Sequence, residues 1–251
     1  MLLSVPDNSA AALVVLPLLT DSTLAASSVF EIGIVSNMLV ELFNRSGLAG
    51  STSLIVDTRQ LASEGCLSWP QARLAEVPSR PWRVGFAKDM AVPLPLDSLE
   101  AMSSADSSLI TREIARLSSA IAEGDDPAFG GLPFVVRKAY RFSLPTTFVV
   151  AADVVRKINE EANPREEHLL LVAERPLSVN STYSAVFHSR VAGSEDAVRT
   201  NEILGAIRFV KTNATVIVVS FEYEDGGRIA LLQRTGDRSW TTRWRSAYTG
   251  C

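Results

Sequence analysis

Alternating apolar and polar residues at the C-terminal end of the chain predict three strands. β-Branched and aromatic residues fill 215–223, a second run covers 228–233, and residues 240–248 alternate with a period of two. Turn sequences at 225–227 (Asp-Gly-Gly) and 235–237 (Thr-Gly-Asp) separate these runs. Such turns favour hairpins because glycine adopts positive φ without steric cost. The pattern therefore predicts a C-terminal three-stranded meander.

The last of these runs has two faces of different character. Tryptophan and small polar residues occupy one face, whereas Arg243 and Arg245 lie on the other. Side chains alternate between the two faces of a strand, so we expect one buried face and one that meets water or a partner. The residues expected to share the buried face are Trp240, Thr242, Trp244, Ser246 and Tyr248.

Short apolar runs bounded by turn residues predict further strands along the chain. Two of them, 38–43 and 53–57, form a predicted hairpin around residues 44–47. Another predicted pair, 134–142 and 147–154, turns at residues 144–145. The remaining predicted strands are 11–16, 29–35, 82–86, 168–173 and 182–191.

Two or three segments have the spacing of helices instead. The clearest begins at Asp106 and carries one apolar stripe formed by Ile110, Ile114, Leu117 and Ile121. A second is predicted from Ser194 to Ile207, because Ser194 can cap an acidic first turn that complements the helix dipole. A short third helix is predicted over 156–162. The resulting fold class is α+β, mostly antiparallel β with two or three inserted helices.

A glycine- and proline-containing stretch at 127–133 marks the predicted division of the chain. It separates an N-terminal β-rich half that ends in a helix, residues 1–126, from a C-terminal α+β half, residues 127–251. A chain of 251 residues can also bury a single large core. The alternative is therefore one continuous domain.

Composition excludes some classes of function. The net charge of −4 argues against a general nucleic-acid binder, which is normally basic. No apolar run reaches the roughly 18 to 20 residues of a spanning helix, so we expect no transmembrane segment and membrane association only through a partner.

Motifs for catalysis and cofactor binding are missing from the sequence. It contains no phosphate-binding loop, no dinucleotide fingerprint, no nucleophile elbow and no zinc-protease motif. His168 and His188 could bind a metal with Glu166 or Glu167 if their strands pair, but we favour ordinary strand histidines. A Ser-His-Asp triad would require an arbitrary choice of partners. We therefore predict no catalytic residues, no metal and no cofactor.

The two cysteines, Cys66 and Cys251, are predicted to form a disulfide. The number is even, no metal motif competes for the thiols, and a bridge would hold a chain end that otherwise frays. Such bonds persist in oxidising compartments, so the prediction implies a periplasmic or extracellular protein. The alternatives are a buried Cys66 with a loose terminal thiol, or an intermolecular bridge through Cys251.

Arginines are concentrated at the C-terminal end, where residues 228–251 contain a single acid, Asp237. We predict a partner-binding face formed by Arg228, Arg243 and Arg245, suited to an acidic protein surface, an anionic glycan or a lipid headgroup. The alternative is a half-buried sheet whose arginines are simply solvated.

Together these features predict a non-enzymatic, extracytoplasmic binding or assembly domain. A protein partner is expected, with the chain acting as an accessory subunit of a larger envelope or membrane-associated complex. The alternatives are a hydrolase whose active site the sequence does not identify, and a small-ligand binder.

Overall fold

The computed structural model describes most of the chain after residue 36. The described residues are 2–4, 11–14, 37–56, 69, 71–121, 126–161, 163–178 and 181–250. Cys66, Cys251 and the predicted strand at 29–35 lie outside these residues. Within them, every strand pairing is antiparallel.

The N-terminal strands close into a six-stranded barrel in the order β1-β2-β5-β4-β3-β6. The predicted hairpin around residues 44–47 is confirmed. Its turn is held by the Asn44 side chain, which accepts from the backbone N–H groups of Ser46 and Gly47, and Gly47 has a φ of 140° that favours glycine. The barrel strands are β1 (Leu2–Ser4), β2 (Ala11–Val14), β3 (Leu39–Asn44), β4 (Gly47–Val56), β5 (Gln71–Leu74) and β6 (Val84–Ala87).

Two open sheets follow the barrel. The helix-side sheet has the order β12-β11-β10-β9-β8, and the central sheet has the order β16-β15-β14-β13-β7, with β17 pairing to β15. The helix-side strands are β8 (Asp97–Ser98), β9 (Val135–Leu144), β10 (Thr147–Ile158), β11 (Arg165–Pro176) and β12 (Ser184–Ser194). The central strands are β7 (Ala91–Leu94), β13 (Thr200–Phe209), β14 (Thr215–Tyr223), β15 (Gly226–Gly236), β16 (Ser239–Arg245) and β17 (Thr249–Gly250). The predicted C-terminal meander is β14-β15-β16.

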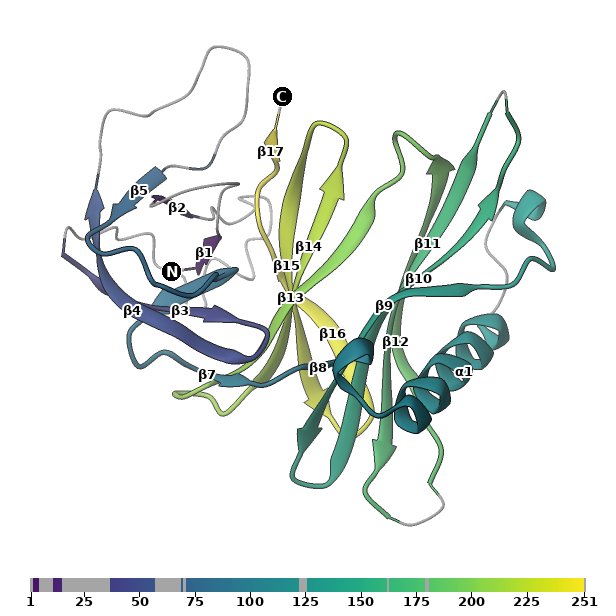
Figure 1. The fold of residues 1–251 in the computed structure, drawn as a ribbon, viewed down its shortest axis with the longest axis horizontal. Coiled ribbons are helices and arrows are strands. Elements are labelled where there is room, and N and C mark those ends of the chain that lie inside the picture. The colour runs from purple at the N-terminus through teal and green to yellow at the C-terminus, as the bar shows by residue number, and fades with distance from the viewer. Residues whose placement is uncertain are drawn as a thin grey trace.

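These units stack in layers, in the order barrel, central sheet, helix-side sheet and helix α1 (Figure 1). One apolar core lies between the barrel and the central sheet, and includes Phe86 and Val218. A second joins the central sheet to the helix-side sheet, and includes Ile217 and Leu170. The barrel interior has its own core around Leu42. The central sheet is therefore covered on both faces.

The predicted main helix is confirmed as α1 (Ser104–Ala120). Ser103 is its N-cap, and the Ser103 side chain accepts from the backbone N–H of Asp106. The predicted apolar stripe packs on the helix-side sheet, with Ile110, Ile114 and Leu117 buried and Ile121 partly buried. Short 3₁₀ helices, η2 (Leu99–Ala101) and η3 (Pro127–Phe129), flank α1 in the chain.

The second and third predicted helices are wrong, and α1 is the one α-helix of the described residues. Residues 194–207, predicted as the second helix, contribute a turn and most of β13. The third predicted helix, 156–162, begins inside β10, which extends to Ile158. Strand β13 is buried on both faces, so its apolar residues are nearly continuous, as in Ile203-Leu204 and Ala206-Ile207. Such a run also satisfies helical spacing, which explains the error.

The expectation that Trp240 and Trp244 share a face is also wrong. Both are buried, but Trp240 lies in the core beside the helix-side sheet and Trp244 in the core beside the barrel. In the register between β15 and β16, the adjacent residues Leu231 and Leu232 pair with Trp244 and Thr242. Arg243 is therefore the extra residue of a β-bulge, which reverses the alternation.

The division at residue 126 stays a prediction. Three elements on its N-terminal side contribute to the layers formed by later strands: β7 pairs with β13, β8 pairs with β9, and α1 packs on the helix-side sheet. Among the described residues, no helix has the length and apolarity needed to span a membrane.

Candidate arginine site and the acidic groups behind it

Two of the three predicted arginines lie together on the central sheet. Arg228 on β15 is opposite Phe221, and Arg245 on β16 is opposite Ala230. Both neighbours belong to the core beside the helix-side sheet, so the two arginines share that face as diagonal neighbours. Arg243 is exposed at the bulge.

A third arginine, Arg199, joins this face just before β13. Its guanidinium carbon lies 4.2 Å from the centre of the Phe221 ring, and its Nη2 donates to Ser189 Oγ at 3.2 Å. Loss of hydration lowers the pKa of Arg199 and the charge of Arg245 acts in the same direction, whereas a hydrogen bond with Tyr223 acts to raise it. We refer to Arg199, Arg228 and Arg245 as the arginine cluster.

Two tyrosines frame the arginine cluster. The rings of Tyr223 and Tyr248 meet edge to face at 5.9 Å, and the Arg228 guanidinium lies 5.8 Å from the Tyr248 ring centre. The Tyr248 hydroxyl donates to Asp225, which raises the pKa of Tyr248 to about 12. This hydrogen bond anchors the ring against which Arg228 is placed.

The arginine cluster has unsatisfied hydrogen-bonding capacity. The Nε atoms of Arg199 and Arg228 are buried and have no hydrogen-bond partner. Among the described residues, no ion pair joins any of the three arginines to a carboxylate. Buried N–H groups normally find an acceptor, so this arrangement is suited to one supplied from outside.

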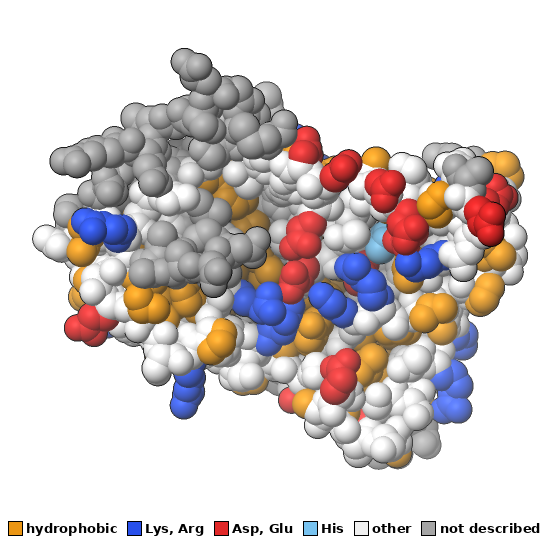
Figure 2. All heavy atoms as spheres, turned by 45° about the horizontal axis from the view of Figure 1, so that its top comes forward, with side chains coloured by type: hydrophobic (Ala, Val, Ile, Leu, Met, Phe, Trp, Pro, Cys, Tyr) orange, Lys and Arg blue, Asp and Glu red, His pale blue; other side chains and the backbone are white. Residues whose placement is uncertain are grey.

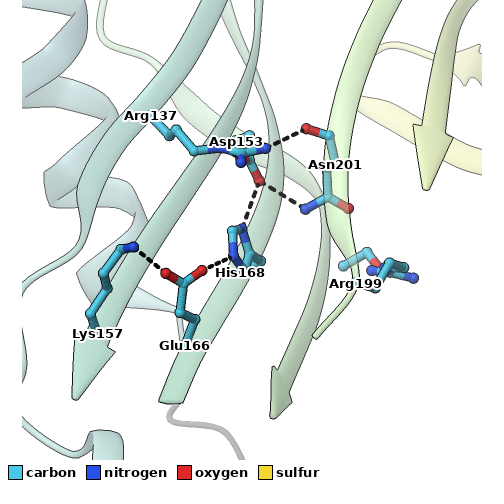
Figure 3. Close-up of polar contacts among 8 residues, drawn as sticks. Arg137, Asp153, Lys157, Glu166, His168, Arg199 and Asn201 are labelled. Carbon is cyan, nitrogen blue, oxygen red and sulfur yellow. Dashed lines mark hydrogen bonds and ion pairs between the residues drawn. The ribbon is translucent and has the colours of Figure 1, made fainter. Parts of the chain in front are cut away.

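Asp153 and Glu166 are engaged in a buried network between the two sheets (Figure 3). Asp153 is fully buried, accepts from Arg137 Nε at 2.5 Å, and accepts from Asn201 Nδ2 at 2.8 Å. His168 lies beside it, with Nδ1 3.6 Å from Asp153 Oδ1. The strands that supply these groups belong to both sheets, so the network also ties the layers together.

The network continues from His168 to the protein surface. His168 Nε2 lies 2.7 Å from Glu166 Oε2, and Glu166 also pairs with Lys157. Burial acts to raise the pKa of Glu166, but its contacts with Lys157 and His168 outweigh this and hold that pKa below its usual value. Figure 3 shows Arg199 beyond Asn201, with no hydrogen bond or ion pair to these acids, and the charge of Asp153 acts only at longer range to raise the pKa of Arg199. Asp153 therefore has its hydrogen-bond partners in Arg137 and Asn201 and forms no ion pair with the arginine cluster.

The histidine metal site considered from the sequence is not assembled. The strands of His168 and His188 do pair, but His168 lies opposite Val191 and His188 opposite Leu171. Residues 168 and 171 on β11 point to opposite faces, so the two imidazoles are separated by the sheet. In the described part of the chain, no group of three or more potential ligands could hold a metal ion.

A carboxyl pair occupies the other face of the central sheet, beside the barrel. Glu202 accepts from Arg45 Nη2 at 2.6 Å and from Arg83 Nη1 at 2.8 Å, both across the interface with the barrel. Burial acts to raise the pKa of Glu202, but the hydrogen bond from Arg45 and the surrounding basic charges bring it below its usual value. Loss of hydration, together with the charge of and the hydrogen bond to Glu202, raises the pKa of Glu222. In Figure 2, acidic and basic side chains lie side by side near the middle of the face that is shown.

The raised pKa of Glu222 predicts a pH-dependent effect of Glu222→Gln. A carboxyl with a raised folded pKa stabilises the fold when protonated, and this contribution is lost as pH rises through that pKa. At pH 7 the variant should therefore be slightly more stable than the wild type, with a free energy of unfolding higher by less than about 0.5 kcal/mol. Its unfolding temperature should rise accordingly. Below pH 4 the difference should vanish. Thermal unfolding across pH tests this, with Glu224→Gln in the exposed adjoining turn as the control; a destabilised Glu222→Gln protein at pH 7 would contradict the assignment.

Arg199 and the buried acids were missed by sequence reasoning. Arg199 falls in the segment predicted as helix, so its place beside Phe221 could not be recognised. The pairing of Glu202 with Arg45 joins residues 157 positions apart, for which the local pattern holds no signal. Comparison of the chain with protein-family models, curated proteins and solved structures gives no match.

Proposed function

We propose that the chain is a non-enzymatic binding domain that recognises an acidic segment of a protein partner through the arginine cluster. One observation carries the proposal: two buried Nε–H groups, on Arg199 and Arg228, have no acceptor within the described structure. Carboxylates supplied by a partner would accept hydrogen bonds from both Nε–H groups. They would also offset the lost hydration that lowers the pKa of Arg199.

The chemistry of the arginine cluster favours a carboxylate-rich protein. Guanidinium groups form planar, two-point hydrogen bonds with carboxylates, and arginine with tyrosine is typical of the centres of protein interfaces. Tyr223, which is 38% exposed, adds apolar contact area next to the arginines. A net charge of −4 argues against nucleic acid as the partner. An accessory role in a larger envelope or membrane-associated assembly fits such a surface and remains part of the proposal.

A fluorescent glutamate-rich peptide provides a defined probe of this site. We expect binding at low ionic strength that weakens as salt is added, and a loss of about tenfold or more in affinity for Arg228→Gln/Arg245→Gln. Arg243→Gln should weaken binding less, because Arg243 is the unpaired residue of the bulge and lies outside the arginine cluster. Fluorescence anisotropy measures these affinities.

The control is Arg112→Gln/Arg208→Gln, which also removes two positive charges, from exposed positions on α1 and β13. Arg112→Gln alone removes one of them. Both control variants should bind as the wild type does. Equal loss in Arg112→Gln/Arg208→Gln and in Arg228→Gln/Arg245→Gln would indicate general charge attraction and refute a specific site. Absence of peptide binding to the wild type at low salt would refute the proposal as well.

An extracytoplasmic location, periplasmic or extracellular, belongs to the same proposal and depends on the predicted bond between Cys66 and Cys251. Thiol titration of the denatured, unreduced protein should detect no free thiol, and two after reduction. Two thiols per chain before reduction would remove the disulfide and the reason for placing the protein outside the cytosol.

A further inference from the structure

A pocket lies between the barrel and the central sheet, on the face opposite the arginine cluster. Its volume is about 330 Å³, within the range of roughly 300–1,000 Å³ typical of small-ligand sites. Barrel residues form one side and residues of β13, β14 and β15 the other. The residues that line it include Trp69, Arg83, Glu202, Ser220, Glu222 and Ile229.

The ionic groups of this pocket largely compensate one another. Glu202 is bound by two arginines from the barrel, and Arg83 is thereby already committed to a carboxylate. Partial loss of hydration and a hydrogen bond with Glu202 raise the pKa of Glu222, although its side chain stays partly in contact with solvent. Neither a free cation nor a free anion is therefore the natural ligand, because each would compete with an existing partner.

The opposite wall contains an unsatisfied donor. Trp69 is 5% exposed and forms part of the pocket lining, and its indole Nε1 has no hydrogen-bond partner. A buried indole N–H normally has an acceptor. The indole therefore gives the barrel side of the pocket an apolar surface and a single donor, and Ile229 adds an apolar side chain on the central-sheet side.

We propose that this pocket binds a neutral polyhydroxylated molecule of saccharide size. Its hydroxyl groups would donate to the carboxyl oxygens of Glu202 and Glu222 and accept from the Trp69 N–H, while its C–H face packs on the indole and Ile229. Ser220, which also lines the pocket, offers a hydroxyl that both donates and accepts. Arg228 of the arginine cluster also borders this pocket, but its side chain alternates with that of Ile229 and so belongs to the other face of β15. The saccharide site therefore does not depend on the function proposed for the arginine cluster.

Saturation-transfer NMR on the full chain tests the site with a panel of neutral mono- and disaccharides, together with acetate and tetramethylammonium as charged probes. We expect at least one saccharide to bind and the charged probes to bind more weakly or not at all. Trp69→Phe keeps the apolar ring and removes the N–H, and should weaken saccharide binding about five- to tenfold. Ser220→Ala should weaken it in the same way.

Glu224→Gln, which alters an exposed carboxylate in the turn next to the pocket, should leave binding unchanged. Circular dichroism confirms that each variant is folded, and Ser220→Ala keeps the test decisive if Trp69→Phe does not fold. The proposal is overturned if no saccharide in the panel binds the wild type, or if a charged probe binds more tightly than every saccharide. Unaltered binding in a folded Trp69→Phe or Ser220→Ala variant would overturn it too.

Discussion

Replacing Glu174 with alanine is expected to lower the free energy of unfolding by about 3–5 kcal/mol. Glu174 is 1% exposed and accepts from Arg234 through both carboxylate oxygens, at 2.8 and 3.0 Å. It also accepts from Trp240 Nε1 at 2.6 Å. Its removal leaves the indole N–H of Trp240 without an acceptor and leaves the largely buried guanidinium of Arg234 with only the exposed Asp237 as a partner.

Asp237 provides a matched control because it contacts the same arginine. Arg234 Nη2 donates to Asp237 at 3.1 Å, but the Asp237 side chain is 95% exposed. Exposed ion pairs contribute little, so Asp237→Ala should change stability by less than about 0.5 kcal/mol. Urea denaturation of both variants gives the comparison. Similar losses in the two variants would mean that burial of Glu174 does not determine the strength of its ion pair.

Replacing Ile114 with alanine should also be severe, with an expected loss of about 2–5 kcal/mol. Ile114 is fully buried on α1 and packs in the core that joins the helix to the helix-side sheet. The truncation removes three carbon atoms and leaves a cavity that the surrounding strands can fill only in part. Equilibrium denaturation measures the loss.

Thr111→Ala is the control for this second prediction, because Thr111 is exposed on the same helix. It should change stability by less than about 0.5 kcal/mol. A loss below about 0.5 kcal/mol for Ile114→Ala would place that residue at the surface and contradict the packing of α1.

Elements with a strong local signal were predictable from the sequence. The α1 stripe has a clean helical period, and the β3-β4 and β14-β15 turns contain residues that select hairpins. Strand β13 was not predictable in this way. It is covered on one side by the barrel and on the other by the helix-side sheet. Because both of its faces are buried, its apolar and polar residues do not alternate with the period of two that identifies a strand.

The candidate site was predictable only in part for a related reason. Arg228 and Arg245 could be proposed because they lie in strands with a clear local pattern, and the register then places them on one face. The bulge at Arg243 has no local sequence signal. It leaves Arg243 unpaired, so this residue no longer shares a face with Arg245 as the alternation predicted. Arg199 and Asp153 acquire their surroundings only when the two sheets stack.

NMR of the arginine Nε–H groups during titration with the glutamate-rich peptide tests directly whether the arginine cluster binds carboxylates. We expect the Nε–H signals of Arg199 and Arg228 to shift and become protected from solvent exchange as peptide carboxylates accept hydrogen bonds from them. The signal of Arg137, already bonded to Asp153, should stay in place. Unchanged Arg199 and Arg228 signals at saturating peptide, or equal shifts at Arg137, would contradict an arginine cluster that binds an acidic partner.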